Sequence, residues 1–80
     1  MITIKKIGIY DSKHENECIY FFDENGKYHR DADLPAVILP LGSQFWFKHG
    51  LLHREVNKPA IIHADGKKEF YMNGERYLYN

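Results

Sequence analysis

One segment of this sequence recurs at a fixed spacing, and the repetition limits the possible folds more than any other feature. The six residues that begin at Asn25 align with the six that begin at His49, so that glycine, histidine and arginine coincide at a shift of 24 (50 minus 26, 53 minus 29, 54 minus 30). The register continues through the Pro-Ala pairs that begin at Pro35 and Pro59. Repetition at such a period is typical of stacked supersecondary units that contact their neighbours.

The repeat divides the 80 residues of a single domain, residues 1–80, into three parts. Residues 1–18 match nothing downstream and are expected to form an N-terminal capping strand and loop. Residues 19–66 contain two full units, with Phe22 and Trp46 at the same aromatic position. Residues 67–80 form a truncated unit without the His-Arg pair, which is typical of the last unit that caps a repeat stack.

Each unit has the pattern of two short strands joined by tight turns. Pairs of Asn-Gly or His-Gly at positions 25, 49 and 73 suit hairpins that need positive φ. Strong strand formers dominate, and no window keeps a helical period. The sequence therefore predicts an all-β fold, a single antiparallel β-meander of about eight short strands built from these repeats.

The isoleucines near the N-terminus change parity, at positions 2 and 4 and then at 7 and 9. A bulge near Lys5 and Lys6 would keep both pairs on one face of a strand. We therefore expect a bent strand there, followed by a polar loop over residues 11–17 and, at the other end of the sequence, a final strand over residues 77–79.

Charge, length and cysteine content exclude several classes of function. The sequence has 11 Lys and Arg against 11 Asp and Glu, which argues against a general polyanion binder and against an acidic nucleic-acid mimic. Cys18 has no cysteine to pair with and is expected to be a small apolar strand residue. No apolar segment has the length of a membrane span, so we expect a cytoplasmic protein without a membrane partner.

Short units with an aromatic strand, Gly-x-x-His-Arg and then Pro-Ala resemble the MORN-like β-repeats of small phage, giant-virus and bacterial proteins. The resemblance covers residues 19–80 and rests on Gly26, His29, Arg30, Pro35 and Ala36, on Gly50, His53, Arg54, Pro59 and Ala60, and on Trp46. It implies a scaffold for contacts and no shared chemistry. By analogy with small phage-encoded proteins, it implies an inhibitor of a host defence or nucleic-acid-processing protein.

The recurring His-Arg pairs have a functional and a structural interpretation. If equal positions lie side by side, His29 with His53 and Arg30 with Arg54 form two ladders available to a ligand. Alternatively, the carboxylates that follow each arginine and nearby carbonyl groups satisfy these side chains without any ligand. We favour the structural interpretation.

Neither a metal site nor a catalytic site is indicated. Among the five histidines, His49 and His53 are four apart across a hairpin turn, where their side chains are expected to point apart. Cys18 and Asp65 lack a positioned base and an oxyanion site, and no phosphate-binding glycine loop is present. We therefore expect no enzyme, no cofactor and no metal.

A non-enzymatic protein-binding module is the function that we expect. Tyrosine, tryptophan and arginine are enriched at interface hot spots, so we assign the anchors to Tyr28, Trp46 and Arg54. Scaffold residues that also contact the partner, a host factor, are His29, Arg30 and His53. A homodimer remains open, because apolar residues face both sides of the strands. The alternative is single-stranded nucleic-acid (RNA) binding by aromatic and Arg/Lys strand residues, which the neutral charge disfavours.

Overall fold

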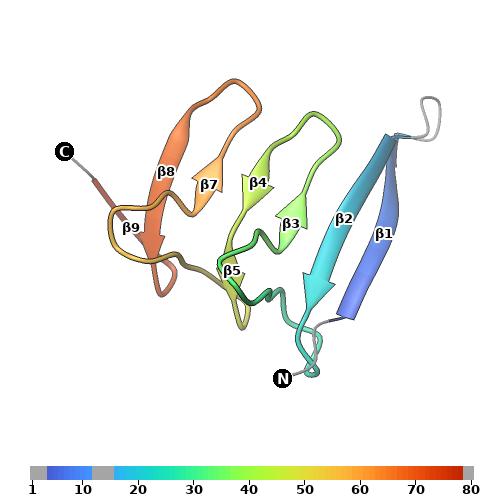
Figure 1. Ribbon diagram of the computed structural model, residues 1–80, viewed down its shortest axis with the longest axis horizontal. Coiled ribbons are helices and arrows are strands. Elements are labelled where there is room, and N and C mark those ends of the chain that lie inside the picture. The colour runs from blue at the N-terminus through green and yellow to red at the C-terminus, as the bar shows by residue number, and fades with distance from the viewer. Residues whose placement is uncertain (1–3, 12–15, 79–80) are drawn as a thin grey trace.

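The computed structural model describes residues 4–11 and 16–78, which form antiparallel β structure. Its strands are β1 (Ile4–Asp11), β2 (Asn16–Phe22), β3 (Val37–Ile38), β4 (Gln44–Phe45), β5 (Phe47–Lys48), β6 (Leu51–Leu52), β7 (Ile61–Ile62), β8 (Lys68–Met72) and β9 (Glu75–Tyr77). Seven of them form a sheet in the order β1-β2-β3-β4-β7-β8-β9, and β5 pairs with β6 (Figure 1). The predicted all-β antiparallel class is confirmed.

Strand pairing changes at Trp46. Before this residue, β4 pairs with both β3 and β7, and after it β5 pairs with β6. The Trp46 N–H donates to the carbonyl oxygen of Ala60 at 2.7 Å, so the tryptophan remains joined to the main sheet. The β5–β6 hairpin therefore branches from the meander, a feature that the sequence pattern did not indicate.

Two of the predicted turns share one backbone conformation. His49 and Gly50 have φ values of 47° and 89°, and Asn73 and Gly74 have values of 50° and 84°. Two consecutive residues with positive φ are what a two-residue type I′ hairpin requires. The glycine N–H at each turn donates to a carbonyl oxygen of the preceding hairpin, that of Tyr28 for Gly50 and that of Leu52 for Gly74.

The first hairpin is one residue longer than the second. The His29 N–H donates to the carbonyl oxygen of Phe21, a separation of eight in the sequence (29 minus 21), whereas the His53 N–H donates to that of Trp46, a separation of seven (53 minus 46). Phe21, rather than Phe22, is therefore the spatial counterpart of Trp46. The prediction that Phe22 occupies this position is wrong, because the longer turn shifts the strand before it by one residue.

Alanine occupies a fully buried position between neighbouring strands in both units. Ala36 and Ala60, at equal positions of the two units, have no exposed surface. Ala36 donates its N–H to the carbonyl oxygen of Phe45 and accepts the N–H of Phe21, both at 2.8 Å. Ala60 likewise donates its N–H to the main-chain carbonyl oxygen of Glu69 at 2.9 Å. A larger side chain at either position would have no space without displacing a strand.

The N-terminal part of the sheet is more regular than expected. Pairing of β1 with β2 runs without interruption from Ile4 to Ile9, and its irregularity lies between Ile9 and Asp11. The predicted bulge near Lys5 and Lys6 is therefore wrong, because unbroken pairing keeps main-chain hydrogen bonds that a bulge would remove. Residues 16 and 17 belong to β2 rather than to the predicted loop.

Other parts of these expectations fall outside the described residues. Positions 1–3 and 12–15 of the expected N-terminal strand and loop, and position 79 of the expected final strand, are among them. Strand β9 ends at Tyr77, and Leu78 is exposed. Cys18 lies in β2 and is 1% exposed, as predicted for a small apolar strand residue.

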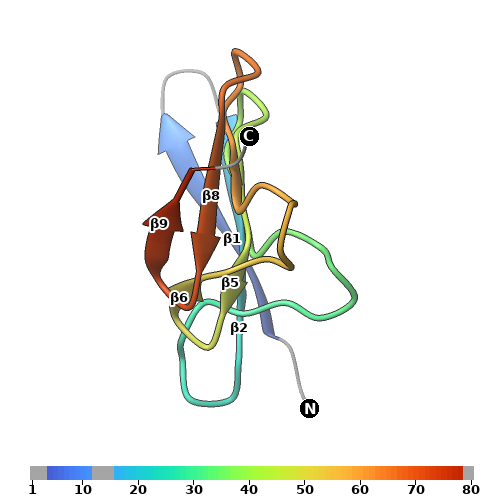
Figure 2. The same ribbon diagram turned by 90° about the vertical axis from the view of Figure 1, so that its left-hand side faces the viewer.

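The sheet has two chemically different faces. Its strands and turns fill a body of 40 × 32 × 18 Å, and the connections over residues 29–36 and 53–60 project from one side of it (Figure 2). We call this side the loop face; it carries Phe21 and Trp46. The other side is the aromatic face, which carries Tyr20 and Phe22.

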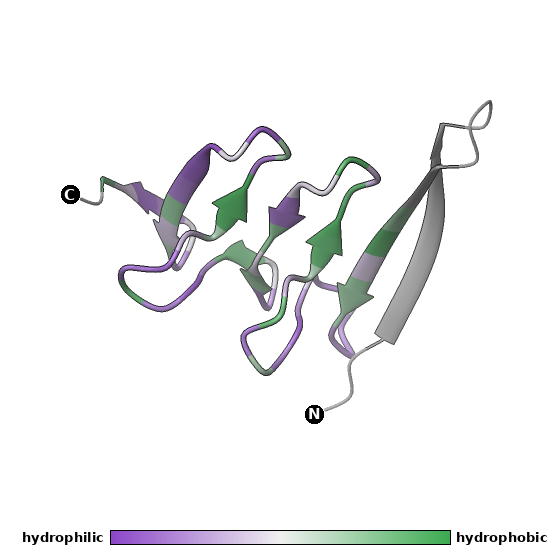
Figure 3. Cartoon of the chain, turned by 45° about the horizontal axis from the view of Figure 1, so that its top comes forward, coloured by the Kyte–Doolittle hydropathy of each residue, from purple (hydrophilic) through white to green (hydrophobic). Residues whose placement is uncertain are grey.

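Apolar residues are concentrated in β3 and β7, whereas the connections are largely hydrophilic (Figure 3).

No helix among the described residues has the length and hydropathy that crossing a bilayer requires.

Candidate partner-binding surfaces

Five of the six predicted binding residues line one groove on the loop face. Its volume is about 230 Å³, and its walls are formed by His29, Arg30, Asp31, Asp33, Trp46, Phe47, Lys48, His53, Arg54 and Glu55. The recurring His-Arg pairs of the two units therefore meet in space. Tyr28, the sixth predicted residue, is not part of this lining.

Arg54 and Trp46 form a stacked pair in the lining of the groove. The guanidinium carbon of Arg54 lies 3.9 Å from the centroid of the Trp46 ring. Trp46 is only 7% exposed, and its indole N–H donates to the main-chain oxygen of Asp33 at 3.1 Å. Trp46, which we assigned from the sequence as a binding anchor, is consequently a core residue covered by an arginine.

The guanidinium of Arg54 is also paired with a carboxylate of the preceding unit. Its Nε and Nη2 donate to the two carboxylate oxygens of Asp33 at 2.9 and 3.3 Å, and its Nη1 donates to the carbonyl oxygen of Pro59 at 3.1 Å. Lys58 adds a bond of 3.1 Å to Asp33. The hydrogen bond from Arg54, followed by that from Lys58, lowers the pKa of Asp33, and Asp33 raises the pKa of Lys58.

His29 connects the first hairpin to the second through both of its ring nitrogens. Nδ1 accepts the main-chain N–H of His49 at 3.1 Å, so the proton of the neutral ring lies on Nε2, which donates to Asp31 at 2.8 Å. This bond lowers the pKa of Asp31. His29 stacks on the ring of His49, with centroids 4.0 Å apart, rather than on His53 as the ladder hypothesis predicts.

His53 repeats this connection in the second unit. Its Nδ1 accepts the main-chain N–H of Asn73, the first residue of the next type I′ turn, at 3.0 Å. His29 and His53 therefore perform the same task in successive units: each accepts the N–H that the following hairpin turn directs toward it. This shared task supports the structural interpretation of the histidines.

Asp23 and His49 form a pair, with a buried carboxylate, that the sequence pattern did not single out. One carboxylate oxygen of Asp23 accepts the N–H groups of Asn25 and Lys27 at 2.9 and 3.0 Å, and the other accepts the Nδ1–H of His49 at 2.7 Å. These bonds, with that of His49 the largest, lower the pKa of Asp23 from 3.8 to about 2. The only sequence signal for this pair is that Asp23 lies four residues before Lys27, at the start of the predicted turn.

Arg30 occupies the same type of environment as Arg54, with one difference. Its guanidinium carbon lies 3.8 Å from the ring centroid of Phe21, and its Nη1 donates to the carbonyl oxygen of Pro35 at 3.3 Å. Within residues 18–78, the part of the chain whose side chains are described, no carboxylate lies within ion-pair distance of this guanidinium. The predicted pairing of Arg30 with the aspartates that follow it is therefore wrong, because Asp31 bonds His29 and Asp33 bonds Arg54.

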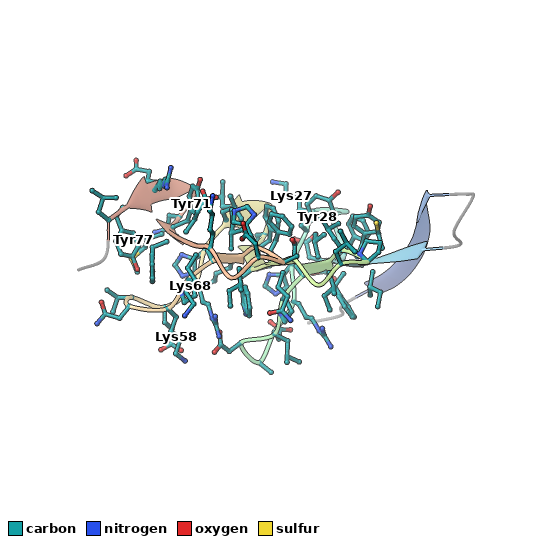
Figure 4. All side chains as sticks on the ribbon, turned by 90° about the horizontal axis from the view of Figure 1, so that it is seen from above. Lys27, Tyr28, Lys58, Lys68, Tyr71 and Tyr77 are labelled. Atoms are coloured by element: carbon teal, nitrogen blue, oxygen red, sulfur yellow. The ribbon has the colours of Figure 1, made fainter. Side chains whose placement is uncertain are left out.

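Tyr28 lies on the aromatic face, among other rings. Its centroid is 5.1 Å from those of Phe22 and Phe47 and 6.0 Å from that of Tyr20. We call these four residues the aromatic row; each is half-buried. Figure 4 shows Tyr28 on the side of the sheet opposite Lys58, which belongs to the loop face. The predicted binding residues are therefore divided between two faces.

The described residues contain no group of three or more His, Cys, Asp or Glu side chains arranged to hold a metal ion. His49 contacts Asp23 and His29, and Cys18 is buried in β2. A hydrogen bond with Cys18 is the largest cause of a raised pKa of Tyr20.

Comparison with known proteins identifies no relative: no family model, curated protein or solved structure matches this sequence.

Proposed function

We propose that this protein is a non-enzymatic protein-binding module that presents the aromatic row to another protein. The observation that carries the proposal is the continuity of the row. Its rings come from β2, from the turn that follows β2 and from β5, with neighbouring centroids 5.1 to 6.2 Å apart. The loops that cover Trp46 project from the opposite face, so they leave these rings half-exposed.

The physical properties of the row suit a protein interface. Aromatic side chains bury large areas with few rotatable bonds, and rings that already pack together lose little further freedom when a partner binds. Exposed apolar patches on small domains commonly mark interaction surfaces. The neutral net charge of the protein also favours an interface based on shape and apolar contact over electrostatic attraction.

The arrangement of the groove supports a non-enzymatic role. His29 has both ring nitrogens in hydrogen bonds within the protein, and Arg54 has an ion pair and a stacked ring. Cys18 is buried in the sheet. A general base or nucleophile needs access to a substrate and a free site for proton exchange. These groups instead hold the hairpins together.

Single-stranded RNA is the competing ligand, because aromatic rows with nearby lysines can stack bases. The contacts of Tyr28 weigh against it. A base needs access to a ring face, and Tyr28 already has Phe22, Phe47 and Tyr20 as neighbours within 6.0 Å. A protein surface can instead contact ring edges and hydroxyl groups of half-buried aromatic residues.

The biological setting that we propose follows the resemblance to small phage-encoded proteins with MORN-like repeats. In that setting the module acts in the host cytoplasm and occludes a surface of a defence or nucleic-acid-processing protein. A single, buried and unpaired cysteine fits a reducing compartment.

Pull-down from the natural host, followed by reconstitution with the purified partner, tests the proposal. We expect one protein at near-stoichiometric yield and a loss of affinity of about tenfold or more for Tyr28→Ala or Phe47→Ala, as for a hot-spot residue. Leu41→Ala, at an 85% exposed site in a turn, is the matched control and should bind as the unaltered protein does. Tyr28→Leu keeps apolar volume if Tyr28→Ala impairs folding, which circular dichroism would report.

Three outcomes would contradict this assignment. The first is normal partner binding by the folded row variants. The second is a salt-sensitive gel shift with RNA that the same variants abolish. The third is a homodimer, detected by light scattering, that dissociates when the row is changed, since the row would then be the contact between two copies.

A further inference from the structure

Arg54 shows which groups surround an arginine that stacks on an aromatic ring in this fold. Three components hold the guanidinium: the Trp46 ring at 3.9 Å, the carbonyl oxygen of Pro59 at 3.1 Å, and the carboxylate of Asp33, which accepts from Nε and Nη2. The carboxylate comes from the preceding unit, at a sequence separation of 21 (54 minus 33). Arg54 therefore depends on an acid that its own unit does not provide.

Arg30 has the first two components and lacks the third. The Phe21 ring lies 3.8 Å from its guanidinium carbon, and the carbonyl oxygen of Pro35 accepts from its Nη1 at 3.3 Å. Arg54 bonds the carboxylate of the residue 21 positions before it. The residue 21 positions before Arg30 is Ile9 (30 minus 21), whose side chain has no carboxylate. Among residues 18–78, whose side chains the structure describes, Nε and Nη2 of Arg30 have no acceptor.

We propose that Arg30 is a binding site for a carboxylate group from a different protein. The ring and the carbonyl oxygen already fix the plane of the guanidinium, so two parallel donors are positioned for a bidentate acid without further loss of side-chain freedom. The neighbouring carboxylate of Asp31 bonds His29 and does not pair with Arg30. The site lies on the loop face, and neither Phe21 nor Pro35, which hold the Arg30 guanidinium, belongs to the aromatic row, although Phe47 of that row also lines the groove.

A second copy of this protein is a poor source of the carboxylate. Suppose that a second copy stacked its last full unit against the first unit of this copy. The residue facing Arg30 would then be the equivalent of Asp33 in that last full unit, which is Asn57 (33 plus 24). An asparagine carries no charge and offers only one acceptor oxygen. The acid is therefore expected from an aspartate or glutamate side chain, or from the terminal carboxylate, of a partner.

Nuclear magnetic resonance of the arginine Nε–H groups tests the site without a known partner. Sodium acetate replaces sodium chloride at constant ionic strength, and we expect a saturating shift for Arg30. Arg54 should not respond, because Asp33 occupies its donors. Arg76, whose side chain is 59% exposed, controls for general ion effects and should shift less, without saturation.

Asp33→Asn provides the matched variant, since it should open the Arg54 site and make Arg54 respond to acetate as Arg30 does. Two peptides then distinguish a side-chain carboxylate from a terminal one. The first has a single aspartate and both termini blocked, and the second has no acidic side chain and a free C-terminus. The stronger shift of Arg30 identifies the source.

Two results would overturn the Arg30 site. One is an Arg30 shift no larger than that of Arg76 in the unaltered protein, which decides the question even if Asp33→Asn does not fold. The other is a response of Arg54 in Asp33→Asn without any response of Arg30. Tyr28→Ala should leave the acetate response unchanged, so failure of this site and failure of the aromatic row are distinguishable.

Discussion

His29 accepts a hydrogen bond at its Nδ1 from the main-chain N–H of His49, in the turn of the following hairpin, and the two imidazole rings stack with centroids 4.0 Å apart. His29 is only 4% exposed, so this bond lies where water competes poorly. The side chain that gives the Gly-x-x-His-Arg pattern its histidine thus joins one hairpin to the turn of the next.

Loss of this connection should destabilise the fold. We expect His29→Leu to lower the free energy of unfolding by about 1–3 kcal/mol, because it leaves the His49 N–H without its acceptor and removes the bond to Asp31. Urea unfolding followed by Trp46 fluorescence measures the change. His53→Leu is the comparison, with a smaller loss expected because His53 is more exposed. An unchanged midpoint for His29→Leu would contradict this role.

Acid should weaken the fold through Asp23. Its pKa in the folded state is about 2, below the ordinary value of 3.8. The unfolded protein therefore binds the proton more readily, so the contribution of Asp23 is present above its ordinary pKa and is lost as the pH falls toward 2. Urea unfolding across this range should show a shallower pH dependence for Asp23→Asn than for the unaltered protein. Equal slopes would show that the bonds to His49 and the turn do not stabilise the ionised form.

The pairing of Arg54 with Asp33 should make lysine a poor replacement. Lysine cannot donate two parallel bonds or stack as a plane on Trp46. We expect Arg54→Lys to cost about 1 kcal/mol, and a double-mutant cycle with Asp33→Asn to give a coupling of similar size. Arg76→Lys, at a site 59% exposed, should change the free energy of unfolding by less than about 0.5 kcal/mol. Equal effects at both arginines would contradict the special geometry of Arg54.

Glycine at position 50 should be difficult to replace. Its φ is 89°, and an added Cβ would lie 3.4 Å from the side chain of Lys27. We expect Gly50→Ala to cost about 1 kcal/mol in thermal or urea unfolding, from the positive φ alone. Gly66 has a φ of 93° with no atom within 4 Å of such a Cβ, so Gly66→Ala measures the backbone effect without the contact. A stabilising effect at either site would contradict the strained conformation.

The sequence was informative where a local rule decides the structure. Turns at His49 and Asn73 follow from residues that tolerate positive φ. The period of 24 likewise predicts that the two Pro-Ala pairs occupy equal positions in the two units. A shift of one residue between two similar hairpins is not decided by such a local rule. Phe21 and Phe22 are both aromatic, so composition could not tell which of them corresponds to Trp46; the length of the first turn decides it.

Contacts between units were the least predictable part of the site. Asp33 follows Arg30 by three positions, which suggested a local pair, but its carboxylate bonds Arg54 of the next unit. The sequence did not predict a contact between His49 and His29, but their rings stack. Both contacts depend on how one hairpin lies on the next, and that geometry is set by packing rather than by neighbours in the sequence.

Each unit completes its loop with contacts from its successor. Asp33 bonds both Trp46 and Arg54, and the Asn57 N–H donates to the hydroxyl group of Tyr77 at 3.2 Å. A hairpin on its own would leave these acceptors and donors to water. The array should consequently melt as a single cooperative transition, and cutting the backbone between units should leave the earlier half unable to complete its own loop.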